Sequence, residues 1–201
     1  MDFVQLAFIV DAPVIAEFFQ LLQQEVKIRR RIGCSVDIFL REEIGAAPET
    51  IAKIQSIILD GKPVDDINSA LVHEGSVLAL SAAMPGLVGA TLRRGGAYSS
   101  FRGAITYHET EAAGMSGKGW VSVKIFNLLM AELGPGLLRQ GVLVHSAAFA
   151  DLLADRPQEF RQGCSVTLDG KPIDIGMLVG TAALQGKEQV LLTVVDSAAN
   201  S

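Results

Sequence analysis

The stretch SIILDGKPVDD, Ser56 to Asp66, occurs a second time as SVTLDGKPIDI, Ser165 to Ile175. Seven of the eleven positions are identical, and the two copies start 165 − 56 = 109 residues apart. Asp-Gly between two apolar runs predicts a hairpin turn in each copy, because glycine tolerates the positive φ of a tight turn. The proline that follows in each copy cannot donate a ladder hydrogen bond, so the next strand is expected to be short or at an edge. The repeat indicates a duplicated structural unit.

The residues around the second copy give this unit its expected order of elements. WVSVKIF predicts a strand at 121–126, and LLRQGVLVH predicts a second strand. SAAFADLLAD follows with Ser146 as a helix N-cap and an amphipathic stripe of Phe149, Leu152 and Leu153. After the hairpin, EQVLLTVV predicts a last strand at 188–195. The predicted order is therefore β-β-α-β-β.

The first copy repeats this order from its second strand onward. EVKIRRRI alternates as a half-buried strand does. Ser35 is then a predicted N-cap and Gly45 a predicted C-terminal stop of a helix. The buried stripe of this helix is expected to comprise Val36, Phe39, Leu40 and Ile44. A helical turn in PETIAKI, the hairpin and a strand at 76–83 complete the unit.

Two regions lie outside this match. At the N-terminus, FVQLAFIV is the candidate first strand, and a helix starting near Pro13 is expected as an insertion. Between the copies, LVGATL and AYSSFRGAITYH flank Gly95-Gly96, which predicts another hairpin. The following glycine-rich segment is a predicted linker. The chain is therefore expected to be α+β, with one unit at 1–113 and a second at 114–201.

A β-β-α-β-β order with an Asp-Gly hairpin after the helix resembles the β-grasp fold of ubiquitin-like proteins. The second copy is similar in particular to the sulfur-carrier family, which includes the small subunit of molybdopterin synthase and the thiamine sulfur carrier. The resemblance implies two β-grasp units in tandem. That family acts through a free C-terminal Gly-Gly, whereas this sequence ends in TVVDSAANS. What remains implied is a module that presents a sheet face to a protein partner.

Composition limits the function further. The chain of 201 residues is 49% hydrophobic, with a mean hydropathy of +0.35, so apolar surface for a partner or a second copy of the chain is expected. The net charge of −5 argues against a nucleic-acid binder. No run is long enough to predict a membrane-spanning helix. The two cysteines, far apart in the sequence, exclude a clustered thiolate zinc site and favour reduced thiols in a cytoplasmic protein.

Charged residues and glycines supply the few candidate site residues. An anion or an acidic partner could contact the basic residues on one strand face and in the region between the copies, namely Lys27, Arg29, Arg31, Arg93, Arg94 and Arg102. The alternative is a solvated face with ion pairs to neighbouring glutamates. Gly95-Gly96 after two arginines resembles a ubiquitin-like tail that cleavage after Gly96 would release. No catalytic residue, metal site or cofactor is predicted.

Three functions remain open. The first is a non-enzymatic protein-interaction or scaffold module related to the sulfur carriers. The second is a ligand-binding protein or enzyme with an anion-binding cleft between the two units, lined by Arg93, Arg94, Arg102 and His108. The third is a latent carrier released by cleavage after Gly96.

Overall fold

The computed structural model describes residues 3–109, 117–154, 164–179, 184 and 186–200. The chain divides into two compact units, one formed by residues 1–26 with 134–201 and the other by residues 27–133. Each unit combines helices with a mixed β-sheet, so the predicted mixture of helix and strand is confirmed. The compact units do not coincide with a division into 1–113 and 114–201, and the predicted boundary itself lies outside the described residues.

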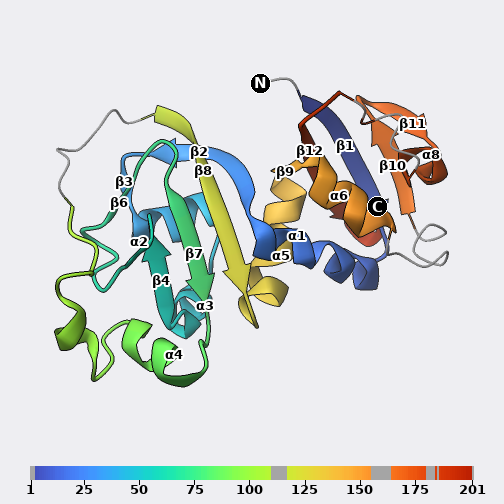
Figure 1. Cartoon of the computed structure of the whole chain (residues 1–201). Helices are drawn as coiled ribbons and strands as arrows, with labels where there is room; N and C mark the ends of the chain where they lie inside the picture. The colour runs from blue at the N-terminus through green and yellow to red at the C-terminus, as the bar shows by residue number, and fades with distance from the viewer. Residues whose placement is uncertain (1–2, 110–116, 155–163, 180–183, 185, 201) are drawn as a thin grey trace. The chain divides into compact units, whose positions relative to one another are not determined.

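Among the described residues, the unit of residues 27–133 contributes five strands to a sheet. Their order across the sheet is β2 (Val26–Ile32), β8 (Gly117–Phe126), β7 (Val77–Ser81), β4 (Ser56–Leu59) and β5 (Lys62–Pro63). Figure 1 shows three of them, β4, β7 and β8, side by side. The central pair β7 and β8 is parallel, whereas β4 runs antiparallel to both β7 and β5. A separate two-stranded sheet pairs β3 (Cys34–Ser35) with β6 (Leu71–Val72).

Helices and apolar strand faces build the core of this unit. Helix α2 (Val36–Ile38) continues into the π-helical η2 (Phe39–Ile44) and presents the predicted stripe, whose four side chains are all buried. The Ser35 hydroxyl accepts a hydrogen bond from the Ile38 N–H, and Gly45 ends the helix in a left-handed conformation, as predicted. The other helices are α3 (Pro48–Lys53), α4 (Gly86–Leu92), η3 (Ser99–Arg102) and the start of α5 (Leu129–Gln140).

In the part of the other unit that the structure describes, five strands form a sheet. Their order is β11 (Lys171–Ile173), β10 (Cys164–Leu168), β1 (Phe3–Val10), β12 (Gln189–Asp196) and β9 (Val142–His145). Strands β1 and β12 are parallel along their whole length, and the other neighbours are antiparallel. The helical segments that accompany these strands are η1 (Ala12–Phe18), α1 (Phe19–Gln24), α6 (Ser146–Ala154), α8 (Ile175–Val179) and η5 (Ser197–Asn200).

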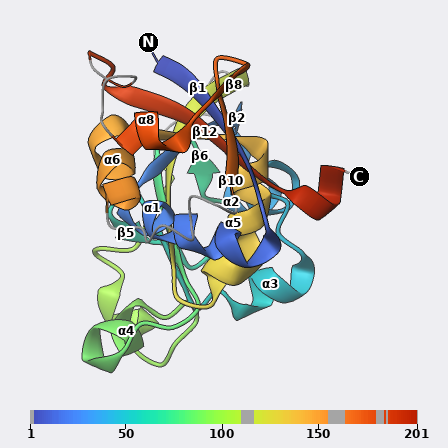
Figure 2. The same ribbon diagram turned by 90° about the vertical axis from the view of Figure 1, so that its right-hand side faces the viewer.

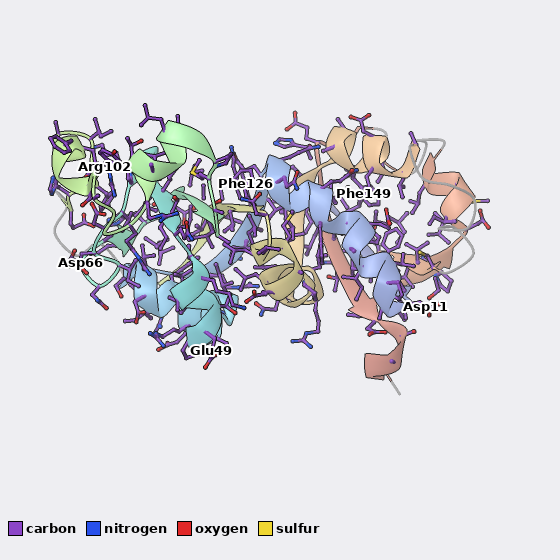
Figure 3. All side chains as sticks on the ribbon, turned by 90° about the horizontal axis from the view of Figure 1, so that it is seen from below. Asp11, Glu49, Asp66, Arg102, Phe126 and Phe149 are labelled. Carbon is purple, nitrogen blue, oxygen red and sulfur yellow. The ribbon has the colours of Figure 1, made fainter. Side chains whose placement is uncertain are left out.

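Three phenylalanines form the centre of the core in this second unit. Phe8 on β1 meets Phe18 at a ring-centroid distance of 5.3 Å and Phe149 on α6 at 5.9 Å, both edge-on, and all three are fully buried (Figure 3 labels Phe149). Edge-on pairs of this kind add to the free energy gained from burial. Helix α6 packs against β9 and β12, as its apolar stripe requires. Its Ser146 is a residue of the helix itself, and its hydroxyl is buried without a hydrogen-bond partner among the described residues.

Both copies of the repeat share one order of main elements, but the first copy also contains β3, α3 and β6 and the second also contains α8. The first copy runs β1, η1–α1, β2, α2–η2, β4–β5 and β7, and the second runs β8, α5, β9, α6, β10–β11 and β12. The insertion expected after the first strand therefore occurs in both copies, and α5 is a helix that the sequence did not reveal. Both Asp-Gly turns have positive φ at Asp and Gly, which confirms the predicted tight turns.

The first strand of each copy joins the elements of the other copy. Strand β1 pairs with β10 and β12 of the second copy, whereas β8 pairs in parallel with β7 of the first copy. We call this arrangement the first-strand exchange. It explains why the compact units differ from a division of the chain into two consecutive halves.

Candidate functional site

A segment without acidic residues follows β7. Residues 84–108, here called the 84–108 segment, contain three arginines and no Asp or Glu in a chain whose net charge is −5. The predicted hairpin around Gly95-Gly96 is wrong, because α4 and η3 take its place. Strand β7 already pairs with β4 on one side and β8 on the other, so neither of its edges is open to a following hairpin.

Helix α4 turns back tightly on the chain before it. A Cβ at Gly89 would lie 1.6 Å from the Met84 carbonyl oxygen, so this position accepts only glycine. Figure 1 shows α4 beyond the ends of β4 and β7, and in the perpendicular view of Figure 2 α4 also lies at the margin of its unit. The 84–108 segment therefore leaves the sheet and adds no strand to it.

Hydrogen bonds attach the 84–108 segment to the rest of its unit. Arg102 is buried, with 4% of its side chain exposed, and its guanidinium donates to Asp65 Oδ1 at 2.7 Å and to the Arg93 carbonyl at 3.1 Å (Figure 3). The Arg94 N–H donates to the Gln55 carbonyl at 2.7 Å. At the far end, the Tyr107 N–H donates to the carbonyl of Pro63 at 2.8 Å and so covers edge strand β5. The segment thus has an ordered backbone.

Large apolar side chains project from this ordered backbone. Eight large hydrophobic residues are exposed among those that the structure describes, and five of them lie in the segment: Leu87, Val88, Tyr98, Phe101 and Ile105. Phe101 is 86% exposed and Leu87 is 74% exposed. The segment also forms a hollow of about 340 Å³, whose lining includes Met84, Ala90, Arg93 and Tyr98. Such a concentration of exposed apolar surface is typical of a contact site for another molecule.

A polar pocket lies next to the end of this segment. Glu109 joins its walls: its carboxylate accepts hydrogen bonds from the Tyr107 hydroxyl at 3.0 Å and the Leu71 N–H at 3.0 Å, and it lies 3.3 Å from His73 Nε2. The side chains of both His73 and Glu109 are about four-fifths buried, at 20% exposure. His108 also lines the pocket, with its Nε2 3.3 Å from the Gly103 carbonyl.

The opposite wall of the pocket comes from two turns. Asp60, in the Asp-Gly turn between β4 and β5, accepts from the Ser76 hydroxyl at 3.0 Å and from the Val77 N–H at 2.7 Å. Glu74 accepts from the Trp120 N–H at 3.0 Å. This last contact needs glycine at position 119, where a Cβ would lie 2.0 Å from Glu74 Oε2.

The predicted basic residues do not form one cluster. On β2, Arg31 pairs with Glu42 and lies 3.4 Å from Glu43, and the hydrogen bond to Glu42 raises the pKa of Arg31. Lys27 and Arg29 lie on the same strand, half-buried and exposed respectively. The expected ion pair with a neighbouring glutamate is therefore present at Arg31.

The arginines of the 84–108 segment have different roles. Arg93 is exposed and Arg94 is half-buried, whereas Arg102 is committed to the ion pair with Asp65. Gly95 and Gly96 form a turn in which the Gly95 N–H contacts Asp65 Oδ1 at 3.4 Å and the Gly96 N–H donates to the Arg93 carbonyl at 3.1 Å. Cleavage after Gly96 would separate β7 from its parallel neighbour β8 in the covalent chain.

Sequence reasoning did not find the pocket. His73, Tyr107 and Glu109 are up to 36 residues apart, and no spacing rule connects them. The run of 25 residues without a carboxylate at 84–108 was the one readable signal of an unusual surface nearby.

The thiols and the other classes of site add little chemistry. Cys34 and Cys164 are free thiols, and burial raises the pKa of both, that of Cys164 to about 11, with a smaller contribution from Asp11. Neither is therefore an activated nucleophile at neutral pH. Within the described ranges, no group of three His, Cys, Asp or Glu side chains is placed to hold a metal ion. No helix in the same ranges is both long and apolar enough to cross a bilayer.

The chain matched no family model, no curated protein and no solved structure.

Proposed function

We propose that this chain is a protein-interaction module related to the β-grasp sulfur carriers, and that the 84–108 segment is its docking surface. The observation that carries the proposal is the grouping of five exposed large apolar side chains on this one hydrogen-bonded segment. A soluble protein rarely leaves such a group exposed without a partner to cover it.

Order in the free chain favours tight binding. The Arg102–Asp65 pair and the backbone bonds of Arg94 and Tyr107 fix the segment before any partner arrives. A fixed surface loses less conformational entropy on association than a flexible one does. Tyr98 and Phe101, whose rings lie 6.4 Å apart, supply the aromatic anchors that dominate many interfaces.

Charge specifies the partner. Arg93 is exposed and Arg94 is half-buried, and the 84–108 segment contains no Asp or Glu. Two copies of this surface placed face to face would bring like charges together. The complementary partner is therefore a different protein with an apolar patch bordered by Asp or Glu.

The kinship with β-grasp proteins rests on the order of elements. The elements that both copies share are two strands with a helix between them, then a helix, a hairpin and a last strand; β3, α3, β6 and α8 have no counterpart in the other copy. The duplicated order supports a common origin of the two copies, and the first-strand exchange distinguishes them from independent tandem domains.

A photo-crosslinking amino acid at position 101 tests the proposal in the native host. The matched control carries the same amino acid at position 177, because Met177 is also exposed, at 65%, but lies outside the segment. We expect a crosslinked protein from position 101 that is absent from position 177. The purified partner should then lose at least tenfold in affinity with Phe101→Asp and little with Met177→Asp, as measured by calorimetry.

Charge reversal provides the second arm of this test. Arg93→Glu with Arg94→Glu should weaken the complex, and low salt should strengthen the wild-type complex. Equal crosslinking from both positions, or adducts only between copies of this chain, would refute the proposed surface.

A further inference from the structure

The polar pocket described above is a cavity of about 390 Å³. Its volume falls in the range of sites for small molecules, about 300 to 1,000 Å³. Side chains converge on it from three separate segments: the β4–β5 turn, the turn before β7, and residues 107–109. None of the five exposed apolar residues lines it, although Tyr107 and His108 at the end of the 84–108 segment do.

We propose that this cavity binds a small organic molecule that carries a protonated amine. Three carboxylates, those of Asp60, Glu74 and Glu109, line it, against one lysine, Lys62. With neutral histidines the formal charge of the lining is −3 + 1 = −2. A cationic group that enters the cavity therefore meets an opposite charge on more than one wall.

Hydrogen bonds from the protein orient two of these carboxylates before a ligand arrives. Glu109 is held by the Leu71 N–H and the Tyr107 hydroxyl, and Asp60 is held by the Ser76 hydroxyl and the Val77 N–H. Glu109 also lies 3.3 Å from His73 Nε2, whereas in the described part of the chain the Asp60 carboxylate has only the two bonds just named. A carboxylate has about four acceptor positions, so Asp60 can bind an ammonium group while it keeps these two bonds. Oriented acceptors avoid part of the entropic loss of binding.

The other residues that line the pocket determine which chemical groups the ligand can carry besides its amine. Lys62 can donate to a hydroxyl or carboxylate on the same ligand, and the Tyr107 ring offers an aromatic wall. The lining has no large aliphatic side chain. A compact polar amine therefore fits better than a lipid or an extended apolar molecule.

The repeat supplies matched control positions for a test. Asp169 and Lys171 occupy in the second hairpin the places that Asp60 and Lys62 occupy in the first. Asp169 also has positive φ and also accepts a backbone bond, from the Gln5 N–H at 2.9 Å. Asp-to-Asn exchange at the two sites therefore changes the same turn chemistry, but only Asp60 lines the cavity.

The experiment titrates the full-length protein, labelled with ¹⁵N, with putrescine, agmatine and tyramine and follows the backbone amides by NMR. Each amine is compared with a hydroxyl counterpart, 1,4-butanediol for the first two and tyrosol for the third. We expect saturable shifts at residues 73–77 and 107–109 with at least one amine and none with its counterpart. Asp60→Asn should weaken binding by about fivefold or more, whereas Asp169→Asn should not.

A gain of affinity guards against a variant that merely misfolds. Lys62→Gln removes the one lysine of the lining and should strengthen about threefold the binding of putrescine or agmatine, which carry no hydroxyl or carboxylate for Lys62 to contact, whereas Lys171→Gln should leave it unchanged. The proposal is overturned if no amine gives saturable shifts in the cavity, if the alcohols bind as well as the amines, or if the variants in the two hairpins behave alike.

Discussion

Loss of the Asp65 carboxylate should release the 84–108 segment. Arg102 is almost fully buried, and Asp65, 32% exposed, is its one ion-pair partner among the described residues. In that part of the chain, Arg102 Nε has no hydrogen-bond partner. In Asp65→Ala the buried guanidinium would therefore keep hydrogen bonds only to the Arg93 carbonyl and the Thr106 hydroxyl. Removing one partner of a buried pair costs about 3–5 kcal/mol. Since water reaches Asp65, we expect a smaller loss here, about 2–3 kcal/mol.

Hydrogen exchange measured by mass spectrometry tests this expectation locally. A loss of about 2–3 kcal/mol corresponds to about 30- to 150-fold faster exchange in peptides that cover residues 93–107. Asp65→Asn, which keeps an acceptor but removes the charge, should lie between the wild type and Asp65→Ala. Glu42→Ala is the matched control, because it removes an arginine partner from an exposed pair. If Asp65→Ala accelerates exchange no more than Glu42→Ala does, the buried pair does not hold the segment and the reasoning fails.

Three further expectations follow from the packing and the thiols. Phe8→Ala should lower the free energy of unfolding by about 3–5 kcal/mol in urea titrations, whereas Phe101→Ala, at an exposed position, should leave it nearly unchanged; equal losses would contradict the assigned core. Gly119→Ala should displace the Glu74 carboxylate and shift the fluorescence of the single tryptophan, and an unchanged spectrum with unchanged amide shifts near residue 74 would argue against the contact. Alkylation of Cys164 at pH 8 should be about a hundredfold slower in the folded than in the urea-unfolded protein, with a rate that rises tenfold per pH unit and levels off only near pH 11; a plateau near pH 8.5 would exclude the raised pKa.

Local sequence determined the turns and the helix that follows the second strand of each copy. Asp60-Gly61 and Asp169-Gly170 both adopt the positive φ that the dipeptide favours, and Ser35 caps its helix as expected. These features depend on a few adjacent residues, so a sequence pattern is sufficient to predict them. The first strand was less clear from the sequence, but its candidate, the apolar run FVQLAFIV, is strand β1.

Features that depend on distant partners could not be read in this way. LVGATL looks like a strand, but β7 has no free edge and the chain folds into α4 instead. LLRQGVLVH was predicted as one strand, yet its first four residues belong to α5, which runs through Pro135, and only Val142–His145 form β9. The exchange of β1 and β8 is invisible in the sequence, because both are apolar strands and either could pair with either copy. The pocket around Glu109 likewise exists only after three segments meet.

The first-strand exchange also has a consequence for how the protein is made. Residues 3–10 leave the ribosome long before their parallel neighbours at 189–196 do. At a synthesis rate of about 5–20 residues per second, β1 waits on the order of 10–40 seconds for β12. During that time an apolar strand with two unpaired edges is exposed to other nascent chains. We therefore expect folding of the newly synthesised chain to depend on chaperones more than folding of a protein whose strands pair in the order of their synthesis does.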